Sequence, residues 1–414
     1  MKRILKLKNP IMPYAWGSHK DLPRFLGKRA PSAQPQAELW MGAHSKAPSR
    51  VRIKNNWRSL DEVIQEAPDA FLGRAAHARF GPNLPFLFKV LAADQPLSIQ
   101  AHPDRTQARK GFLSENRKNM ELTDPRRNFK DDRHKPECIC ALTPFWGVCG
   151  FRPVAEMLPL LSAVWPNRRK SDLDLFGQGE EAQQVKAFFG LLMTLPAEEL
   201  SGLLGHVGCV AHTLCRDSLI YKWIVHLQRQ YPGDPGILSP ILLNLICLQP
   251  GEALFLQAGQ LHAYFGGMGI EIMANSDNVL RGGLTPKHVD MGRLLEILDF
   301  TPGKPDILKP VRQADGAWRY TSQTDEFALG LIDVSPQRPY ACADARHRSP
   351  QILLCARGTA RVALMEDKRV STTLSQGEAA LVPHAAGNYI VQGEARLYQA
   401  AVNLPANESR ESAP

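Results

Sequence analysis

The hydrophobic positions divide the chain into segments of two kinds. Residues 1–150 alternate short apolar runs, such as PFLFKVLAA and ECICALTPFWGVCGF, with Gly, Pro and Asn, which is typical of β-strands joined by turns. Between Pro153 and Leu238 the apolar spacing becomes helical, as in EAQQVKAFFGLLMTL. Strand-like runs return from residue 239 and continue to about Val402, with one predicted helix in GRLLEILDF.

Two strand–turn–strand segments repeat each other. LQPGEALFLQAGQLHAY and LSQGEAALVPHAAGNYI both contain Gly-Glu, then apolar residues, then a His or Asn at the eleventh position after the glycine. Gly251 corresponds to Gly377, and His262 corresponds to Asn388. This hairpin resembles the second half of the cupin signature, a small jelly-roll barrel. We therefore expect two such barrels, with chance similarity of two hairpins as the alternative.

Composition and charge exclude some classes of partner but do not indicate a function. The formal net charge is +9, but the basic residues are dispersed, so we expect a small anionic substrate and no nucleic acid. The densest basic stretch, RRNFKDDRHK at 126–135, is interpreted as a solvated loop. No run approaches the roughly 18 apolar residues of a membrane span, and the start MKRILKLKNP lacks a signal core. We expect no membrane contact and a cytoplasmic protein.

One apolar run carries polar residues that a buried strand does not require. In PLSIQAHPD, Gln100 and His102 are two positions apart, so on a strand both side chains point to one face. They are either hydrogen-bonded core residues or half of a metal site. His262 ends a second apolar run, and Glu137 begins a third after Pro136. Viewed alone, Glu137 also fits an edge residue that meets solvent.

Together these four residues predict a metal centre inside the first barrel. Two imidazoles, one carboxylate and one amide oxygen suit Zn²⁺, one ion per chain, with Fe²⁺, Co²⁺ or Mn²⁺ possible. A cation neutralised by a single carboxylate remains a Lewis acid. His102, Glu137 and His262 also match the ligand set of non-haem iron oxygenases, but Gln100 would occupy a position that oxygenases leave open.

Motifs along essentially the whole chain resemble those of the type I mannose-6-phosphate isomerase family. They are YAWGS, AELWMGAHSKAPS, PFLFKVLAADQPLSIQAHPD, HKPE, LHAY and EIMANSDNVLRGGLTPK, in the family order. The resemblance implies interconversion of mannose 6-phosphate and fructose 6-phosphate by proton transfer between C2 and C1 through a cis-enediol, with zinc on the same four residues. Leu261 and Gly282 depart from the usual family residues, which affects turn stiffness more than chemistry.

This reaction requires a base near both carbons and positive charge near both oxygens. Arg281 resembles the catalytic arginine of the family, and its forked cation can hold an enediolate or a phosphate, unless it only caps its loop. Lys135 is expected to shuttle a proton, since a lysine close to a cation loses its proton more readily. His134 is expected to help open the sugar ring with Asp277. The alternative for Lys135 and His134 is that both are exposed residues of an ordinary charged loop.

Six further residues are candidates for substrate binding. Three offer a hydroxyl or a cation to the phosphate, one carboxylate could orient sugar hydroxyls or pair with a cation, and two belong to family-like motifs. Core packing explains the tryptophan among them equally well. The phosphate candidates are Ser98, Lys89 and Lys287, the carboxylate is that of Glu271, and the residues of family-like motifs are Trp16 and Glu38.

The expected fold is mainly β with an α-helical insertion: two cupin-type jelly-roll barrels plus a helical domain. The catalytic barrel comprises residues 1–152 with 239–308, the helical domain 153–238, the C-terminal barrel without metal 309–405, and a flexible tail 406–414. We expect a monomer that acts on a sugar phosphate. A sugar-phosphate sensor without turnover remains the non-enzymatic alternative.

Overall fold

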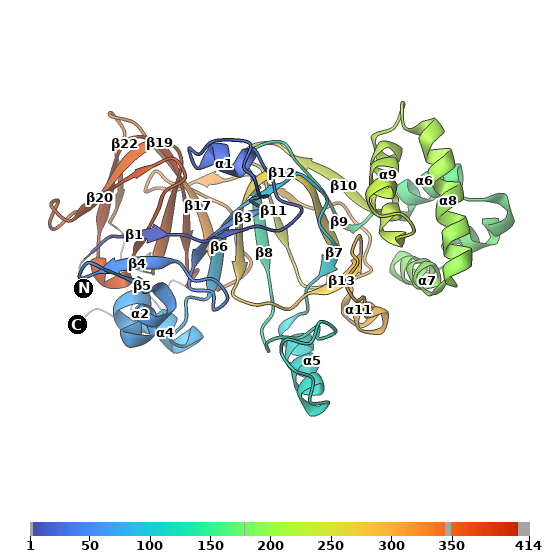
Figure 1. Ribbon diagram of the computed structural model, residues 1–414, viewed down its shortest axis with the longest axis horizontal. Coiled ribbons are helices and arrows are strands. Elements are labelled where there is room, and N and C mark those ends of the chain that lie inside the picture. The colour runs from blue at the N-terminus through green and yellow to red at the C-terminus, as the bar shows by residue number, and fades with distance from the viewer. Residues whose placement is uncertain (1–2, 178, 344–348, 405–414) are drawn as a thin grey trace.

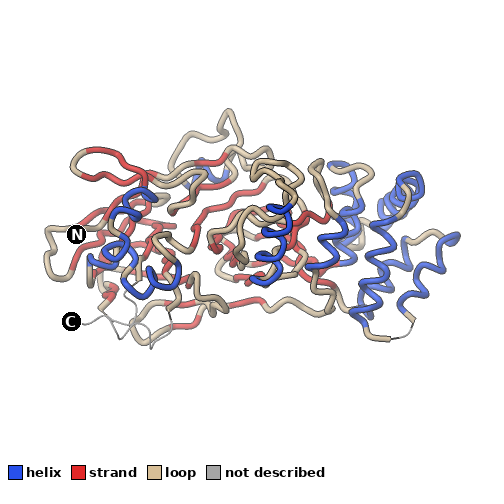
Figure 2. Tube along the Cα trace, turned by 90° about the horizontal axis from the view of Figure 1, so that it is seen from below, coloured by secondary structure: helices blue, strands red, loops and turns tan. Residues whose placement is uncertain are grey.

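The structure is a computed structural model, and it describes residues 3–177, 179–343 and 349–404. These residues form two antiparallel sheets of 11 strands each and a group of helices at one end (Figure 1). Figure 2 shows the same division, with strands over most of the length and helices gathered beyond them. The prediction of a mainly β protein with helices is therefore confirmed.

The central sheet follows the strand order β14-β11-β8-β12-β6-β3-β2, and β7, β9, β10 and β13 pair beside this path. Strand β6 is buried along its whole length, which explains why its sequence FLFKVLAA is almost uninterrupted in apolar residues. The strands of this sheet are β2 (Ile11–Met12), β3 (Glu38–Gly42), β6 (Phe86–Ala93), β7 (Ile99–Ala101), β8 (Glu137–Ala141), β9 (Phe145–Phe151), β10 (Leu243–Leu248), β11 (Ala253–Leu256), β12 (His262–Ala274), β13 (Leu280–Gly283) and β14 (Ile307–Leu308).

Strand β12 connects two halves of the central sheet. Its first residues, from His262, pair with β7 and β9, whereas those from Gly267 onward pair with β6 and β8. The register shifts just before Gly266, and Gly267 has a φ of 115°, which residues with a side chain rarely adopt. The resulting bend brings His262 to within 3.6 Å of Glu137, although Glu137 pairs opposite Met273 near the far end of β12.

The second sheet, the C-terminal sheet, also takes three strands from the N-terminus. Leu5 of β1 pairs with Leu381 of β21, and β1 continues into β4 and β5. This differs from the predicted division, which placed all of residues 1–152 in the first barrel. The N-terminal strands cover an edge that would otherwise be unpaired. The strands of this sheet are β1 (Leu5–Lys8), β4 (Arg50–Ile53), β5 (Asn56–Ser59), β15 (Val311–Arg312), β16 (Trp318–Arg319), β17 (Ala328–Val334), β18 (Tyr340–Cys342), β19 (Gln351–Leu364), β20 (Ser371–Ser375), β21 (Ala379–Val382) and β22 (Tyr389–Ala401).

The two predicted repeats share one turn. Gly251 and Gly377 both have positive φ, 90° and 83°. In each turn the following glutamate, Glu252 or Glu378, accepts a hydrogen bond from the backbone N–H three residues earlier, at 3.0 and 2.9 Å. Each turn also precedes a 13-residue strand, β12 or β22. Neither strand order closes on itself within the described residues.

The helical insertion is present where the apolar spacing predicts it, between β9 and β10. Aromatic rings join it to the rest of the protein, since the ring of Phe189 in the insertion lies 5.6 Å from that of Phe151 in β9 and 6.1 Å from that of Phe300, which is outside the insertion. Its elements are α6 (Val154–Val164), η1 (Asn167–Phe176), α7 (Glu181–Thr194), α8 (Ala197–Leu214), α9 (Leu219–Gln230), η2 (Pro235–Leu238) and α10 (Ser239–Leu242).

Residues 1–150 contain helices that the strand-and-turn prediction missed. The longest, α5, begins at a capping box in which Asp104 and Gln107 bond each other's backbone N–H groups. The helices outside the insertion are α1 (Asp21–Phe25), α2 (Leu60–Glu66), α3 (Pro68–Leu72), α4 (Arg74–Phe80), α5 (Arg105–Arg117), α11 (Met291–Ile297) and η4 (His384–Ala386). Helix α11 is the one predicted in GRLLEILDF.

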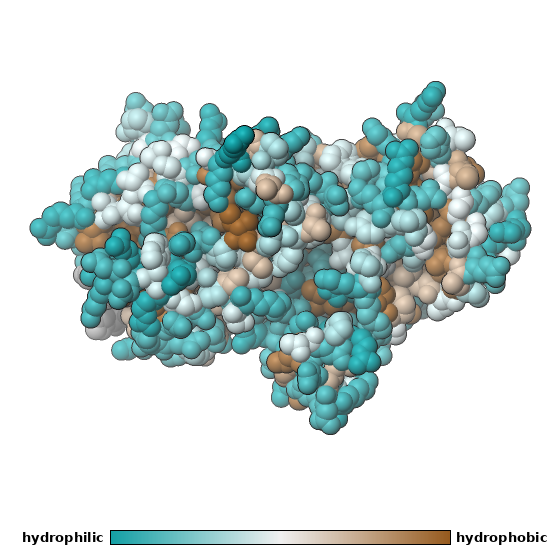
Figure 3. Space-filling view, viewed as in Figure 1, coloured by the Kyte–Doolittle hydropathy of each residue, from teal (hydrophilic) through white to brown (hydrophobic). Residues whose placement is uncertain are grey.

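The outer surface is largely polar on the face that Figure 3 shows, with hydrophobic residues in small separate groups. Among the described residues no single helix has the length and apolar character to cross a membrane. Helices α7 and α8 meet those criteria only when taken together, as a pair bent by 111°.

Candidate functional site

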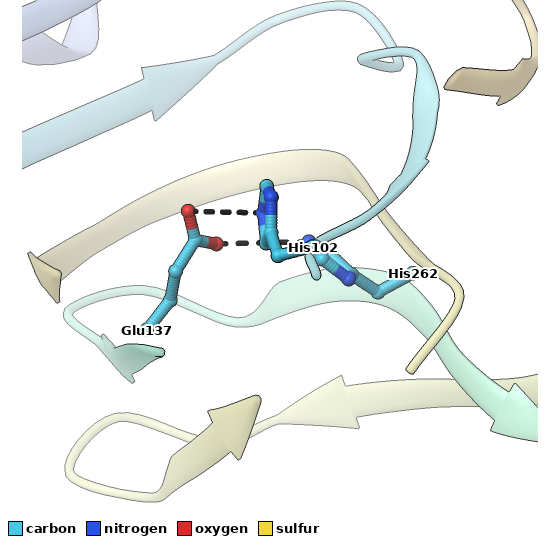
Figure 4. A group of neighbouring side chains, drawn as sticks. All are labelled: His102, Glu137 and His262. Carbon is cyan, nitrogen blue, oxygen red and sulfur yellow. Dashed lines mark ion pairs between the residues drawn. The ribbon is translucent and has the colours of Figure 1, made fainter. Parts of the chain in front are cut away.

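Three of the predicted ligands form one buried group. His102 directly follows β7, while Glu137 and His262 are the first residues of β8 and β12, and their ligand atoms lie within 4.8 Å of one another. Figure 4 shows the Glu137 carboxylate facing both rings, with 3.2 Å to His102 Nε2 and 3.6 Å to His262 Nε2. A tetrahedral zinc ion with ligands at about 2.1 Å separates ligand atoms by about 3.4 Å. The spacing therefore fits a single ion.

The hydrogen bonds around the group favour a bound cation. His102 Nε2 and Glu137 Oε2 are buried without a hydrogen-bond partner, which is costly unless a ligand is bound. The opposite nitrogens are fixed, because His102 Nδ1 lies 2.8 Å from the Asn278 carbonyl and His262 Nδ1 lies 2.9 Å from the Gln260 carbonyl. A carbonyl only accepts, so each Nδ1 carries the proton and each Nε2 offers a lone pair to the group.

Gln100, the fourth predicted ligand, lies next to this group. It pairs directly with His262 between β7 and β12, and its terminal amide lies 3.5 Å from His262 Nε2. Because a half-turn of the amide exchanges nitrogen for oxygen, this side chain can present its oxygen to an ion at the same place. On its other side Gln100 pairs with Arg281 of β13. The backbone register thus brings two ligands and the predicted catalytic arginine together.

The electrostatics keep the ligands ready for a metal at neutral pH. Burial, and next the charge of Lys135, lower the pKa of His102 to about 4, so its ring is uncharged. Burial disfavours ionisation of Glu137, but Lys135, with its Nζ 2.9 Å away, and the histidines hold the pKa of this carboxyl well below its usual value. Only 2% of the Glu137 side chain is exposed, so the edge-strand alternative is wrong.

Arg281, which pairs with Gln100 in the sheet, is one of three cations whose charges act on Lys287. Burial lowers the pKa of Arg281, and burial together with the positive charges of Arg281, Lys130 and Lys46 lowers that of Lys287. Within the described part of the chain the Arg281 side chain has no ion pair. Such a group favours an anionic ligand. Sequence reasoning missed Lys46 and Lys130, since only the fold brings their distant segments together.

A buried chain of charges lies along β3, β6 and β12. Lys89 Nζ is 2.8 Å from Glu271 and 3.8 Å from Glu38, and Glu38 accepts a hydrogen bond of 2.6 Å from the Trp40 indole. Burial lowers the pKa of Lys89, but Glu271 and Glu38 raise it above the usual value of a lysine. The ammonium group of Lys89 is thus held by two carboxylates, and its expected contact with the phosphate stays a prediction. Pairing with a cation, the alternative for Glu271, is what the structure shows.

Removing one member of this buried group of charges should lower the free energy of unfolding far more than removing two. We expect Lys89→Met to lower the free energy of unfolding by about 3–5 kcal/mol, because Glu271 and Glu38 would remain buried without a cation. Lys89→Met with Glu271→Gln should recover most of that loss. Urea unfolding measures both, with Lys222→Met on the exposed face of α9 as the control. Equal losses in the single and double variants would contradict the assignment.

His134 lies away from its predicted partner. Its Nε2 is 2.7 Å from Glu326 and also lies 3.2 Å from Arg105 Nε, so its described contacts are outside the metal group. The residue before a proline is extended, so Lys135, preceding Pro136, and His134 point to opposite sides. The Lys135 side chain points toward the metal group, where its Nζ contacts Glu137. In the described contacts His134 and Asp277 therefore have different partners, and their expected joint role in ring opening stays a prediction.

Asp277 is paired with His44 instead, a residue that sequence reasoning missed. His44 is buried, its ring packs 5.0 Å from that of Trp40, and its Nδ1 accepts a hydrogen bond from the Lys46 N–H. The proton of the neutral ring is therefore on Nε2, which faces Asp277 at 3.6 Å. Burial raises the pKa of Asp277, but His44 and Lys46, whose Nζ is 2.7 Å away, hold it below its usual value.

The other candidates have fewer described contacts with the metal group. Ser98 is half-buried immediately before β7. Trp16 is also half-buried and stacks on Tyr14 with 5.8 Å between ring centroids. Tyr264, missed by sequence reasoning, packs 6.0 Å from the His262 ring, and its buried hydroxyl has no hydrogen-bond partner. An apolar strand gives no sign that such a hydroxyl is unsatisfied.

Comparison with known proteins gives a consistent result. The family profile of the type I phosphomannose isomerase catalytic domain matches residues 4–154. The mannose-6-phosphate isomerase of Escherichia coli (strain K12) is 38% identical over 395 residues, which cover 95% of this chain and 98% of that protein. The human mannose-6-phosphate isomerase is 36% identical over 361 residues, covering 80% and 82%.

Solved structures agree with this result. A crystal structure of a lysine-to-alanine mutant of phosphomannose isomerase from Salmonella typhimurium matches with a TM-score of 0.90 and 36% identity, over 97% of this chain and 100% of that one. Zinc-bound mannose 6-phosphate isomerase matches with a TM-score of 0.88 over the same shares at the same identity. With these relatives matched over nearly its full length, the chain belongs to the type I phosphomannose isomerase family.

Proposed function

We propose that this protein interconverts mannose 6-phosphate and fructose 6-phosphate with one zinc ion bound by Gln100, His102, Glu137 and His262. The observation that carries the proposal is the buried group of unsatisfied ligand atoms in a chain of this family. Zinc-bound relatives of high structural similarity support the choice of metal. The ion supplies a Lewis acid that polarises substrate oxygens.

The cations beside the metal group are assigned to the negative charges of the substrate. Arg281 projects from β13 opposite Gln100, and we assign its guanidinium to the charge that develops on the sugar oxygens. Lys46, Lys130 and Lys287 are assigned to the phosphate, because the positive charges of Arg281, Lys130 and Lys46 all act on Lys287. Ser98 is a candidate hydroxyl donor to the same group, and the stacked Tyr14 and Trp16 offer a wall for the sugar.

Two groups are assigned to proton movements. Lys135, whose Nζ is 2.9 Å from Glu137, is suited to carry a proton between C2 and C1 of a sugar held at the metal group. Asp277 is assigned to opening the sugar ring with His44 behind it, in place of the expected His134. The Lys89–Glu271–Glu38 chain holds the strands that carry these groups in register.

The alternatives receive less support. An iron oxygenase would need the coordination position next to His262, where Gln100 lies. A sensor without turnover would not need a cationic group beside a metal and an acid–base pair together. The named relatives, from bacteria, plants and mammals, are all isomerases.

We also infer the finer architecture expected from the sequence, two jelly rolls with a helical domain. The shared turn before β12 and β22 supports it, and Asn388 in place of a histidine supports a second barrel without metal. The domains would be 1–152 with 239–308, 153–238 and 309–405, except that β1, β4 and β5 join the C-terminal sheet. The expected tail, 406–414, lies outside the described residues. A cytoplasmic monomer without nucleic-acid or membrane partners remains a prediction.

An isomerase assay before and after chelation tests the function. We expect zinc-loaded protein to convert mannose 6-phosphate without oxygen, to lose activity when zinc is removed, and to regain it on adding zinc. A coupled assay and metal analysis measure this, together with exchange of the C2 hydrogen for deuterium from solvent. Tight sugar-phosphate binding without turnover or exchange would establish the sensor instead.

A further inference from the structure

A second cavity, of about 380 Å³, is lined by none of the residues of the metal group. Its walls come from α4, α5, the loop at 132–134, the end of β12 and Glu326 of the segment before β17. Figure 1 shows α4 and α5 projecting on the same side of the molecule. A volume of this size is in the range of small-molecule sites, roughly 300–1,000 Å³.

Arginines from three separate segments meet at this cavity. Arg79 comes from α4, Arg105 and Arg109 lie one turn apart on the same face of α5, and Arg133 comes from the basic loop. The only carboxylates in the lining are Asp132 and Glu326. Part of the stretch that was interpreted as a solvated loop therefore forms a wall of a cavity.

Glu326, the buried carboxylate of the lining, is already committed to other partners, whereas Asp132 is exposed to solvent. Glu326 is 8% exposed, and its Oε1 lies 2.7 Å from His134 Nε2 and 2.9 Å from Arg105 Nη2, while Oε2 accepts from Thr324. Burial raises the pKa of Glu326, but His134 and Thr324 bring it down to about 2, so it is ionised at neutral pH. Arg79 is paired with Asp325.

Two guanidinium groups remain without a carboxylate. In the described ranges Arg109 has no ion pair, and the side chain of Arg133 makes only a long hydrogen bond of 3.5 Å to the Asn275 carbonyl. Like charges that converge on one cavity repel each other, and an anion between them removes that cost. A guanidinium presents two parallel N–H donors, a geometry that matches phosphate oxygens.

We propose that this cavity binds a small phosphate-bearing anion at a site separate from the metal centre, held by Arg109 and Arg133. Arg79, Arg105 and the His134–Glu326 pair form the fixed wall behind them. Both inorganic phosphate and a phosphate monoester have the required chemistry. The inference does not depend on the isomerase assignment, because none of the residues that carry it belongs to the metal centre or to its cationic group.

The test is titration of the zinc-loaded full chain with inorganic phosphate, and separately with glycerol 3-phosphate, by calorimetry. We expect two phosphates per chain, one at the cations beside the metal group and one in the cavity. Arg109→Gln with Arg133→Gln should remove the second, weakening that event at least about tenfold, while the KM for mannose 6-phosphate stays unchanged. Tighter binding of glycerol 3-phosphate than of phosphate at the second site would identify a monoester as the occupant.

Matched variants control for charge and folding. Lys110→Gln with Arg117→Gln removes two cations from α5 that do not line the cavity, and it should keep both binding events. Arg109→Lys with Arg133→Lys keeps the charge without the fork and should bind more weakly than the wild type but better than the glutamine variant. A glutamine variant that takes up as much phosphate as the wild type, with the same affinities, would overturn the proposal. Loss of isomerase activity alone would leave it standing.

Discussion

Replacing His262 with alanine is expected to remove zinc and isomerase activity together, lowering kcat/KM about a thousandfold or more. The variant loses a buried ligand whose Nε2 is directed at Glu137 by the hydrogen bond of its Nδ1 to the Gln260 carbonyl. The Lewis-acid contribution of a metal is several kcal/mol, and each 1.4 kcal/mol is a factor of ten. Zinc content by metal analysis and a coupled isomerase assay measure the two losses.

A second histidine variant serves as the control for this experiment. His206→Ala changes an exposed residue of α8, distant in sequence from the ligands, and should keep both zinc and activity. If His262→Ala lost its zinc and still turned over at the wild-type rate, the metal would have no part in the reaction. If it kept zinc at wild-type affinity, His262 would not be a ligand.

Replacing Arg281 with alanine is expected to separate the two properties, leaving zinc bound while kcat/KM falls about 10²–10³-fold. Arg281 lies opposite Gln100 in the strand pairing but is not itself a ligand, so the metal group should remain intact. Removing one donor aimed at developing negative charge typically costs about this factor. We expect most of the loss in kcat, because the three lysines assigned to the phosphate remain in this variant.

The control for charge is Arg312→Ala, an exposed arginine of β15, which should behave as the wild type. Loss of zinc from the Arg281 variant would show that the arginine supports the ligands rather than the reaction. A rise in KM at constant kcat would assign it to ground-state binding of the phosphate.

The candidate site was predictable to the extent that its chemistry is local. Gln100 and His102 share a face in PLSIQAHPD, and both lie at the metal group. The capping box of α5, formed by Asp104 and Gln107, was also present in the sequence, three positions apart, and was overlooked because the helix it starts is largely polar. That element could have been predicted by the same reasoning.

Other parts of the site depend on long-range contacts. His134 and Lys135 are adjacent in a charged stretch, but only the packing decides that Lys135 faces Glu137 and that His134 faces Glu326. His44 becomes the partner of Asp277 through contact between segments far apart in the chain. Residue type limits which pairs are possible, but it does not select among them.

By itself the sequence determined the kinds of residue and their local arrangement: alternating strands, a helical insertion, a repeated turn, and four candidate ligand side chains in or next to strands. Local backbone preferences and the period of two in a strand are enough for these features. Only the tertiary structure decided which ends meet. The bulge and the bend at Gly266 and Gly267 bring the start of β12 to Glu137, and the fold gathers arginines of α4, α5 and the loop at 132–134 around one cavity. These long-range contacts depend on how the whole chain packs, so they cannot be predicted from a short stretch of residues.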